Sequence, residues 1–295
     1  MRVIYDIVRD GLSAISRASE ALELAQRQVS TGRRLVGSST DPLASQQAVG
    51  EHAALAQIDA YTRTRDAASS RLAATDNVLS GIVDKISASI VTATGARGTA
   101  VTQAAREAAA ESVRGLRESL VADVNSKFNG NALFAGTATN TTAYAKVAGA
   151  WIYQGNTAAQ QVEIEQDRLV SISLNGQNIV QGSDTTDLFT TLDDLETALT
   201  SGDDDGIGTA LSGLDRAFDR ALLAQGRLGA DERGVDDAAS RLSALKVAAE
   251  TRRSKLEDAN LAESVTRLTQ ANQAYQAALG AVSSAERISL LDYLR

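Results

Sequence analysis

The sequence LAESVTRLTQANQAYQAALGAV (residues 261–282) carries an apolar or aromatic side chain at most positions of a stripe that steps by four and three residues in alternation. The positions of this stripe are Leu261, Val265, Leu268, Asn272, Tyr275, Leu279 and Val282. The alternation is the heptad spacing of a coiled coil, with about two apolar positions in seven. Because the stripe is narrow and Asn272 interrupts it, it predicts a long helix that is stable only against a partner.

The opposite end of the chain repeats this pattern. Its stripe consists of Val8, Leu12, Ile15, Ser19, Leu22, Gln26 and Val29. Two terminal helices of one character predict an antiparallel pair, and the same stripes also suit contacts between subunits. The candidate assembly interface is the apolar part of both stripes with two leucines near the C-terminus, namely Val8, Leu12, Ile15, Leu22, Val29, Leu261, Val265, Leu268, Tyr275, Leu279, Val282, Leu290 and Leu291.

The composition of the 295-residue chain favours long, thin helices. Only 4% of the residues are aromatic, there is one proline, and alanine, the best helix former, is abundant. The chain has no cysteine and a single histidine, His52, which excludes disulfides, thiol chemistry and zinc sites built on cysteine and histidine. No apolar run reaches the length of about 18 residues that a membrane span needs. The N-terminal residues MRVIYDIVRDGLS lack the apolar core of a cleaved signal peptide.

The net charge of −8 is concentrated in one segment. Residues 183–206 contain eight acids and no lysine or arginine, so the rest of the chain is neutral as a whole. Because no basic patch is left to follow a phosphate backbone, nucleic acid is not an expected partner. The acidic segment itself either contacts a partner or keeps an exposed loop soluble.

Helical spacing also fills much of the chain between the two ends. It continues through residues 44–128 and returns in residues 188–199, 207–222 and 242–256. The stripe in the first of these segments consists of Leu72, Val78, Leu79, Ile82, Ile86 and Ile90. Thr186 or Asp187 has the side chain of an N-cap for the helix that follows it. Asn260 and Glu263 have the spacing of a capping box, which predicts a kink or a new helix start there.

Residues 141–183 have a different pattern, in which apolar and polar residues alternate around Trp151–Tyr153, Val162–Ile164 and Val170–Leu174, up to Asn175-Gly176. Such alternation predicts strands joined by hairpins. We therefore predict a mainly α fold in which long antiparallel terminal coiled-coil helices and a helical bundle carry a small β-rich insertion. The predicted domains are a terminal coiled-coil core (1–40 and 257–295), a helical bundle (41–140 and 184–256) and an outer β-rich insertion (141–183).

No residue pattern forms a credible active site. Asp203-Asp204-Asp205-Gly206 resembles a calcium loop, but the register of an EF-hand would place serines at its first and twelfth positions. Asp193 and Asp194 are neighbours on a helix, so their carboxylates point about 100° apart and belong to a solvated face. His52 is interpreted as a surface or hydrogen-bonded helix residue. We predict no catalytic, cofactor-binding or metal-ligating residue.

Four short motifs occur in the order that is typical of one protein family. Ser30–Leu35, followed by Asp41-Pro42, resembles the N-terminal signature of the flagellar hook-associated protein 3 family, the hook–filament junction proteins. Gly130–Thr137 is similar to the G-x-x-L-F-A-G-T motif of that family, Tyr153–Asn156 to its turn at the start of the β insertion, and Ser289–Leu294 to its terminal motif. The motif residues are Gly32, Arg34, Asp41, Pro42, Leu133, Phe134, Gly136 and Thr137. Flagellins, which are related, usually have Asp-Ala-Ala-Gly in place of residues 41–44.

The resemblance implies a structural component of the bacterial flagellum rather than an enzyme. Proteins of that family are exported unfolded through the flagellar type III machinery without a cleaved signal, and an export chaperone is expected. Outside the cell the family joins the hook to the filament. The implied partners are hook-associated protein 1 on the hook side, flagellin on the filament side and further copies of the chain. No cofactor, nucleic acid or membrane is implied.

Two other functions are alternatives. A minor flagellin-type filament subunit would have the same helical ends and would polymerise by itself. A secreted wall hydrolase carried on flagellar-type ends would need a paired acid and base in the β-rich region. The candidates there are Glu163, Glu165 and Asp167, and their spacing forms no such pair.

Overall fold

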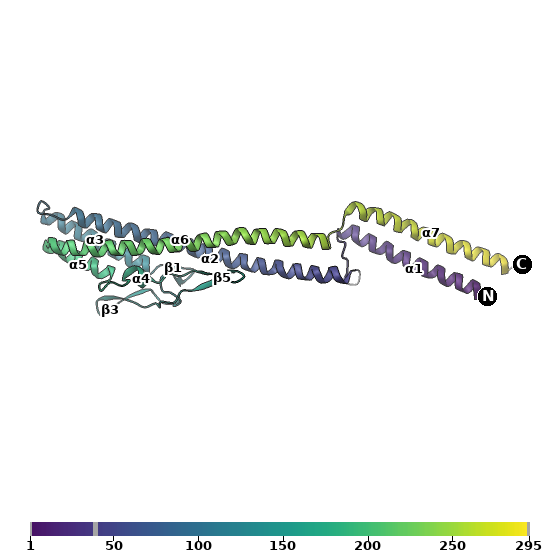
Figure 1. The fold of residues 1–295 in the computed structure, drawn as a ribbon, viewed down its shortest axis with the longest axis horizontal. Helices are drawn as coiled ribbons and strands as arrows, with labels where there is room; N and C mark the ends of the chain where they lie inside the picture. The colour runs from purple at the N-terminus through teal and green to yellow at the C-terminus, as the bar shows by residue number, and fades with distance from the viewer. Residues whose placement is uncertain (1, 38–40, 294–295) are drawn as a thin grey trace. The chain divides into compact units, whose positions relative to one another are not determined.

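The computed structural model describes residues 2–37 and 41–293, and it describes the side chains of residues 9–37 and 41–284. The helices are α1 (Arg2–Thr31), α2 (Pro42–Gly95), α3 (Gln103–Val124), α4 (Gly176–Val180), α5 (Leu188–Ser201), α6 (Asp204–Glu257) and α7 (Leu261–Tyr293). The strands are β1 (Lys127–Phe128), β2 (Asn131–Ala132), β3 (Tyr144–Val147), β4 (Ala150–Tyr153), β5 (Gln161–Glu165) and β6 (Arg168–Ser171). The predicted mainly α fold with a small β-rich part is confirmed (Figure 1). None of the described helices combines the length and the apolar character needed to cross a membrane.

The chain divides into two compact units. Unit 1 comprises Met1–Ile58 and Ala244–Arg295, and unit 2 comprises Asp59–Ser243. The long helices α2 and α6 therefore contribute to both units. The three domains predicted from the sequence divide the chain differently, and that division stays a prediction.

In unit 1, α1 and α7 lie side by side and antiparallel, as predicted (Figure 1). Asn260 begins α7, because its side-chain oxygen accepts hydrogen bonds from the backbone N–H groups of Ala262 (3.1 Å) and Glu263 (3.4 Å). Glu263 does not complete the capping box, since its carboxylate accepts a hydrogen bond from Arg267 instead. The predicted new helix start at Asn260 is thus confirmed, with half of the predicted cap.

Unit 2 contains a hydrophobic core to which α2, α3, α5 and α6 all contribute. Its fully buried side chains include Leu72, Leu79, Ile82 and Ile86 of α2, Leu120 of α3, Leu192 and Leu195 of α5, and Leu214 of α6. The stripe predicted in residues 44–128 therefore faces the core. Full burial of one such side chain contributes about 1.5–3 kcal/mol. Because unit 2 buries many of them, we expect it to fold by itself.

Two side chains begin helices in the segment between the strands and α6. Asp187 is the N-cap of α5, and its Oδ1 accepts hydrogen bonds from the N–H groups of Phe189 (2.8 Å) and Thr190 (2.9 Å). Asn175 is the N-cap of the short helix α4. The alternating pattern thus stops at Asn175-Gly176, where the Asn175 side chain accepts a hydrogen bond from the N–H of Gln177 and starts a helix.

Three antiparallel hairpins, β1–β2, β3–β4 and β5–β6, lie beside the helices of unit 2 (Figure 1). The turn between β1 and β2 is Asn129-Gly130, and both residues have positive φ (50° and 82°), as a two-residue hairpin turn requires. This hairpin precedes residues 141–183, so strand structure begins before the segment in which it was predicted. The signal was present as an Asn-Gly pair, but the strands on either side of it have two residues each.

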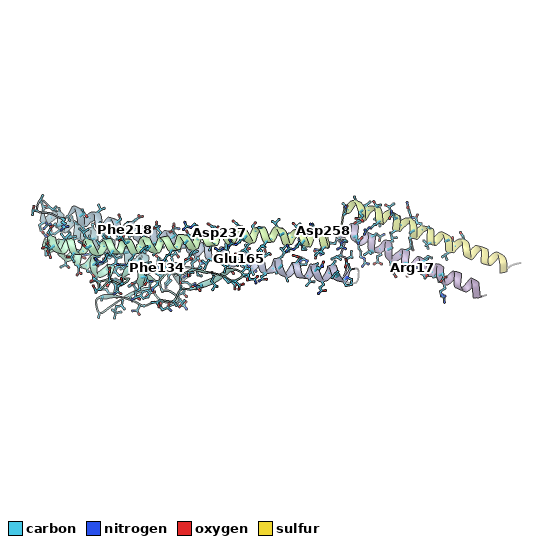
Figure 2. All side chains as sticks on the ribbon, in the orientation of Figure 1. Arg17, Phe134, Glu165, Phe218, Asp237 and Asp258 are labelled. Carbon is cyan, nitrogen blue, oxygen red and sulfur yellow. The ribbon has the colours of Figure 1, made fainter. Side chains whose placement is uncertain are left out.

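Two of the sequence motifs are hydrogen-bonded to each other, namely Leu133–Thr137 and Tyr153–Asn156. The side-chain oxygen of Asn156 accepts a hydrogen bond from the N–H of Thr137 (2.9 Å), and its amide donates to the Thr137 hydroxyl (2.7 Å). The Tyr153 hydroxyl donates to the carbonyl oxygens of Phe134 and Asn156, both at 3.0 Å. Phe134, which Figure 2 labels among the side chains of unit 2, is fully buried. The two motifs thus form one structural clasp that joins β2 to the end of β4.

Gly136 is required at the centre of this clasp. Its φ is +66°, a conformation that a residue with a Cβ rarely adopts. A Cβ at this position would lie 2.3 Å from the carbonyl oxygen of Asn156, which is backbone and cannot swing aside.

We expect Gly136→Ala to destabilise the protein by about 2 kcal/mol or more, since it combines a strained φ with a backbone clash. The urea midpoint of unfolding, followed by circular dichroism, measures this loss. Gly115→Ala is the matched control, because Gly115 is exposed in α3 and a Cβ there meets open space. The control is expected to gain about 0.5–1 kcal/mol from helix propensity. Equal midpoints for Gly136→Ala and the natural chain would show that the clasp contributes nothing.

Candidate assembly interface

The contact between α1 and α7 is lined by small residues and larger ones in similar numbers. The buried and half-buried positions along α1 include Gly11, Ala14, Ile15, Ala18, Leu22, Ala25, Gln28 and Val29. Those along α7 are Ser264, Leu268, Ala271, Tyr275, Ala278 and Val282, again in steps of four and three. At one point Gly11 allows a very close approach, because a Cβ there would lie 2.7 Å from Cγ2 of Val282.

The structure divides the predicted interface residues into two groups. Half-buried along the α1–α7 contact are Ile15, Leu22, Val29, Leu268, Tyr275 and Val282. Exposed are Leu12 (59%), Leu261 (58%), Val265 (46%) and Leu279 (43%). The side chains of Val8, Leu290 and Leu291 lie outside the described residues. The role of all these residues in assembly stays a prediction.

The exposed group forms an apolar stripe that the pair does not use. Val265 follows Leu261 by four residues, and Leu279 follows Val265 by two heptads, so the three share one side of α7. Alanines share the seam within the pair with larger residues such as Leu22 and Tyr275, and the exposed group lies beside it. We call Leu12, Leu261, Val265 and Leu279 the outer stripe.

The N-terminal signature forms the joint between the two ends of unit 1. The N–H of Arg34 donates to the carbonyl oxygen of Glu257 (2.6 Å), and its guanidinium donates to the carbonyl oxygen of Leu256 (2.7 Å). These are unsatisfied carbonyls at the end of α6, so Arg34 caps that helix. The guanidinium also lies 3.3 Å from Asp41, the acid before Pro42 that begins α2. Gly32, with φ +67°, ends α1 and accepts a hydrogen bond from Ala259.

The start of α2 has an acid with a lowered pKa, Asp41, followed by a proline at the first helical position. Asp41 accepts a hydrogen bond from the N–H of Ala44 (3.0 Å), and this bond, with that from Arg34, lowers the pKa of the Asp41 carboxyl. Pro42 occupies the first helical position, where a missing N–H costs nothing. The signature is therefore structural, since its residues end α1, cap α6 and begin α2.

His52 is a hydrogen-bonded helix residue, as interpreted from the sequence. Its Nε2 lies 2.6 Å from Oε1 of Glu257, which is itself buried. Among the side chains of residues 9–37 and 41–284, no group of three or more histidine, cysteine, aspartate or glutamate residues could hold a metal ion.

The acidic segment is largely tied to arginines, which sequence reasoning missed. Asp193, expected on a solvated face, forms an ion pair with Arg117 of α3. Glu196 accepts hydrogen bonds from Arg114 (2.5 Å) and Arg117 (3.0 Å). The hydrogen bond from Arg114 is the main cause that lowers the pKa of Glu196.

Two further acids of this segment, one before and one after α5, also bind neighbouring segments. Asp184 lies 3.1 Å from Arg216 and also pairs with Arg220 of α6. Asp204 accepts a hydrogen bond from the N–H of Gly98 (2.8 Å). The interpretation of residues 203–205 as a solvated loop is wrong for Asp204, because α6 already begins there.

Two family models match the chain and define its class. The bacterial flagellin N-terminal helical region matches residues 10–139, and the bacterial flagellin C-terminal helical region matches residues 211–294. Together they cover most of the chain, including the described helices that form the terminal pair. The protein is of the flagellin-like class, in which helical regions at both ends flank the rest of the chain.

Relatives within this class indicate the family. The chain is 28% identical over 223 residues to flagellar hook-associated protein 3 of Escherichia coli K12, covering 68% of this chain and 70% of that protein. A putative flagellar hook-associated protein from Vibrio parahaemolyticus has the same fold (TM-score 0.70, 18% identity, 74% of this chain and 100% of that chain). So does the flagellar junction protein FlgL from Legionella pneumophila (TM-score 0.63, 14% identity, 72% and 100%). The chain is therefore similar to the flagellar hook-associated protein 3 family, as its sequence motifs indicated.

The Glu196 cluster predicts a pH dependence of stability. The pKa of the Glu196 carboxyl in the folded protein is below the ordinary value of 4.5, so the ionised carboxylate stabilises the fold above that pH. This contribution is lost as the pH falls through the folded-state pKa. We expect Glu196→Gln to lose about 1–2 kcal/mol at pH 7, and the difference from the natural chain to close below pH 4.5.

Urea midpoints measured from pH 7 to pH 3 check this expectation. Asp194→Asn is the control, because Asp194 is exposed and makes no ion pair with the described residues. A difference between Glu196→Gln and the natural chain that stays constant with pH would contradict the assignment.

Proposed function

We propose that this chain is a structural adaptor that joins the hook to the flagellin filament at the hook–filament junction. The observation that carries the proposal is the terminal helix pair, in which the outer stripe is exposed. Both helices of the pair match the helical end regions of flagellin. Similarity to the family supports the same role, since a relative of the same fold is named the flagellar junction protein.

In this proposal the outer stripe packs against neighbouring copies, so that the terminal pairs form a tube. A pair of helices covers only one face of each member, so neighbours must cover the rest. The contact is heterologous, because the stripe on α7 meets a different surface on the next copy, and such contacts propagate around a ring or helix.

The partners and the location are part of the proposal. Hook-associated protein 1 would contact the hook side, flagellin the filament side, and copies of the chain one another. The chain would leave the cell unfolded through the flagellar type III machinery, with an export chaperone and without a cleaved signal, and would act outside the cell. We propose no enzymatic role, which accords with the structural character of the relatives.

A minor flagellin-type filament subunit is the second candidate, and the match to both flagellin models favours it specifically. The two functions differ in one simple property. Purified chain seeded at high salt would grow long filaments by itself if it were a filament subunit, and a junction protein would not.

We expect Val265→Asp with Leu279→Asp to abolish attached filaments and motility, because both charges fall on the outer stripe. The protein itself should still be exported, and its unfolding midpoint should stay unchanged, since both residues are exposed in the free chain. Electron microscopy, a swimming assay and immunoblotting of the medium measure these outcomes.

The matched control places the same charges elsewhere on α7. Gln270→Asp with Gln273→Asp alters two exposed polar positions and is expected to leave motility intact. Removal of residues 279–295 should reproduce the loss of filaments while unit 2 remains folded. Normal motility in the truncated or the Val265→Asp, Leu279→Asp protein would contradict assembly through the terminal helices.

A further inference from the structure

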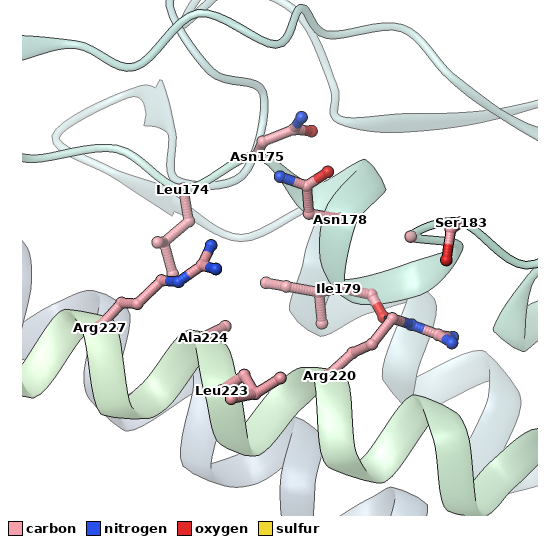
Figure 3. A pocket seen from close by; sticks show the side chains of 10 residues that line it. Leu174, Asn175, Asn178, Ile179, Ser183, Arg220, Leu223, Ala224 and Arg227 are labelled. Carbon is pink, nitrogen blue, oxygen red and sulfur yellow. The ribbon is translucent and has the colours of Figure 1, made fainter.

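Unit 2 has a groove between α6 and the segment that leads into and past α4, with a volume of about 520 Å³ (Figure 3). Leu174, Ile179 and Ala224 line it with apolar surface. Leu223 stands at the groove with 65% of its surface exposed, although it is a large apolar residue. The groove therefore offers an apolar area that nothing in unit 2 covers.

Two arginines of α6 line the same groove and differ in their partners. Arg220 is held by Asp184 and by the carbonyl oxygens of Ile179 (3.2 Å) and Val180 (3.1 Å). Arg227 is exposed and makes no hydrogen bond or ion pair with any residue in the described part of the chain. A segment that fits here has a branched apolar side chain close to a carboxylate.

The hairpin β5–β6 presents that combination. Leu169 has 60% of its surface exposed, and Asp167 lies two residues earlier at the turn, with φ +60°. The carboxylate of Asp167 makes no ion pair within the described residues, whereas Glu165 pairs with Arg241 (2.9 Å). Aspartate tolerates this left-handed conformation better than most residues.

The tip of this hairpin, residues 167–169, is also preorganised. The N–H of Asp167 donates to the Glu163 carboxylate (3.2 Å), which in turn accepts from the hydroxyl of Tyr61 (3.2 Å). Together with the Glu165–Arg241 pair, these contacts fix the hairpin to α2 and α6. A rigid tip loses little conformational entropy when it docks.

The tip cannot fill the groove of its own copy. Its neighbours on α6 are Gly234, beside Arg168, and Arg241. Gly234 is seven residues from Arg227, which is about 10 Å along a helix, and Arg241 is fourteen residues, or about 21 Å, away.

We propose that the β5–β6 tip of one copy docks into the α4–α6 groove of the next copy of this chain. The Asp167 carboxylate pairs with Arg227, and Leu169 packs against Leu223 and Ile179. The inference rests on the proposed assembly function, because only a ring or helical turn of copies brings the two surfaces together. It adds a lateral contact in unit 2 to the contact through the terminal helices. Since tip and groove are different surfaces, the contact is heterologous and repeats from copy to copy.

Cysteine crosslinking tests this contact in assembled flagella, because the natural chain has no cysteine. Leu169→Cys and Leu223→Cys are placed in one chain, and isolated flagella are treated with a short bismaleimide. The expected product on a denaturing gel is a ladder of dimers, trimers and longer multimers of this chain. Co-expression of the two single variants should give dimers and no ladder.

The control pairs Leu169→Cys with Val91→Cys, since Val91 is an equally exposed apolar residue of unit 2 (69%). We expect at least about tenfold less crosslinking in the control, the ratio that about 1.4 kcal/mol of contact free energy gives. Equal yields, monomers only, or crosslinks to another flagellar protein would overturn the inference. Flagella that are intact and contain the variant but give no ladder would leave the adaptor function standing. Absence of the chain from intact flagella would overturn both.

A charge exchange supplies an independent test without crosslinking. Asp167→Arg and Arg227→Asp are each expected to lower the fraction of cells with attached filaments, and the double variant to restore it. A double variant as defective as the worse single variant would overturn the pairing of Asp167 with Arg227.

Discussion

Two antiparallel helices can cover only one face of each other, and the terminal pair of this chain is limited by that constraint. The seam between α1 and α7 combines small residues with larger ones such as Leu22 and Tyr275, and most of its residues are only half-buried. Larger side chains such as Leu12 and Leu279 remain outside the seam. A pair of this kind gains most of its stability when neighbours cover its outer faces, so folding of the ends and assembly depend on each other.

Unit 2 meets the opposite condition. Four helical segments enclose fully buried residues such as Leu79 and Leu192, and the clasp around Phe134 and Gly136 joins β2 to the end of β4. Several of its acids are bound to arginines, as Glu196 is to Arg114. The chain therefore combines a part with a large buried core and a terminal helix pair with exposed apolar residues, which suits the proposed subunit of a larger structure.

The sequence predicted the elements whose signals are local. The heptad stripes gave the terminal pair, Asp187 and Asn260 gave helix starts, and the apolar stripe from Leu72 gave the core face of α2. It failed where the outcome depends on contacts between distant segments. The heptad pattern placed Leu12 and Leu279 in the seam, but the residues at the contact are Gly11 and Ala278, one position away from each. The ion pairs of Asp193 and Glu196 with α3, and the joining of two motifs into one clasp, could not be read from spacing alone.

The central claim is that this chain is the structural link between hook and filament. Deletion of its gene tests the claim most directly, with electron microscopy of the cells and an assay of flagellin in the medium. The account predicts hooks without filaments and flagellin released into the medium, because exported subunits would have no surface on which to build. Filaments still attached to hooks in the deletion strain would contradict it.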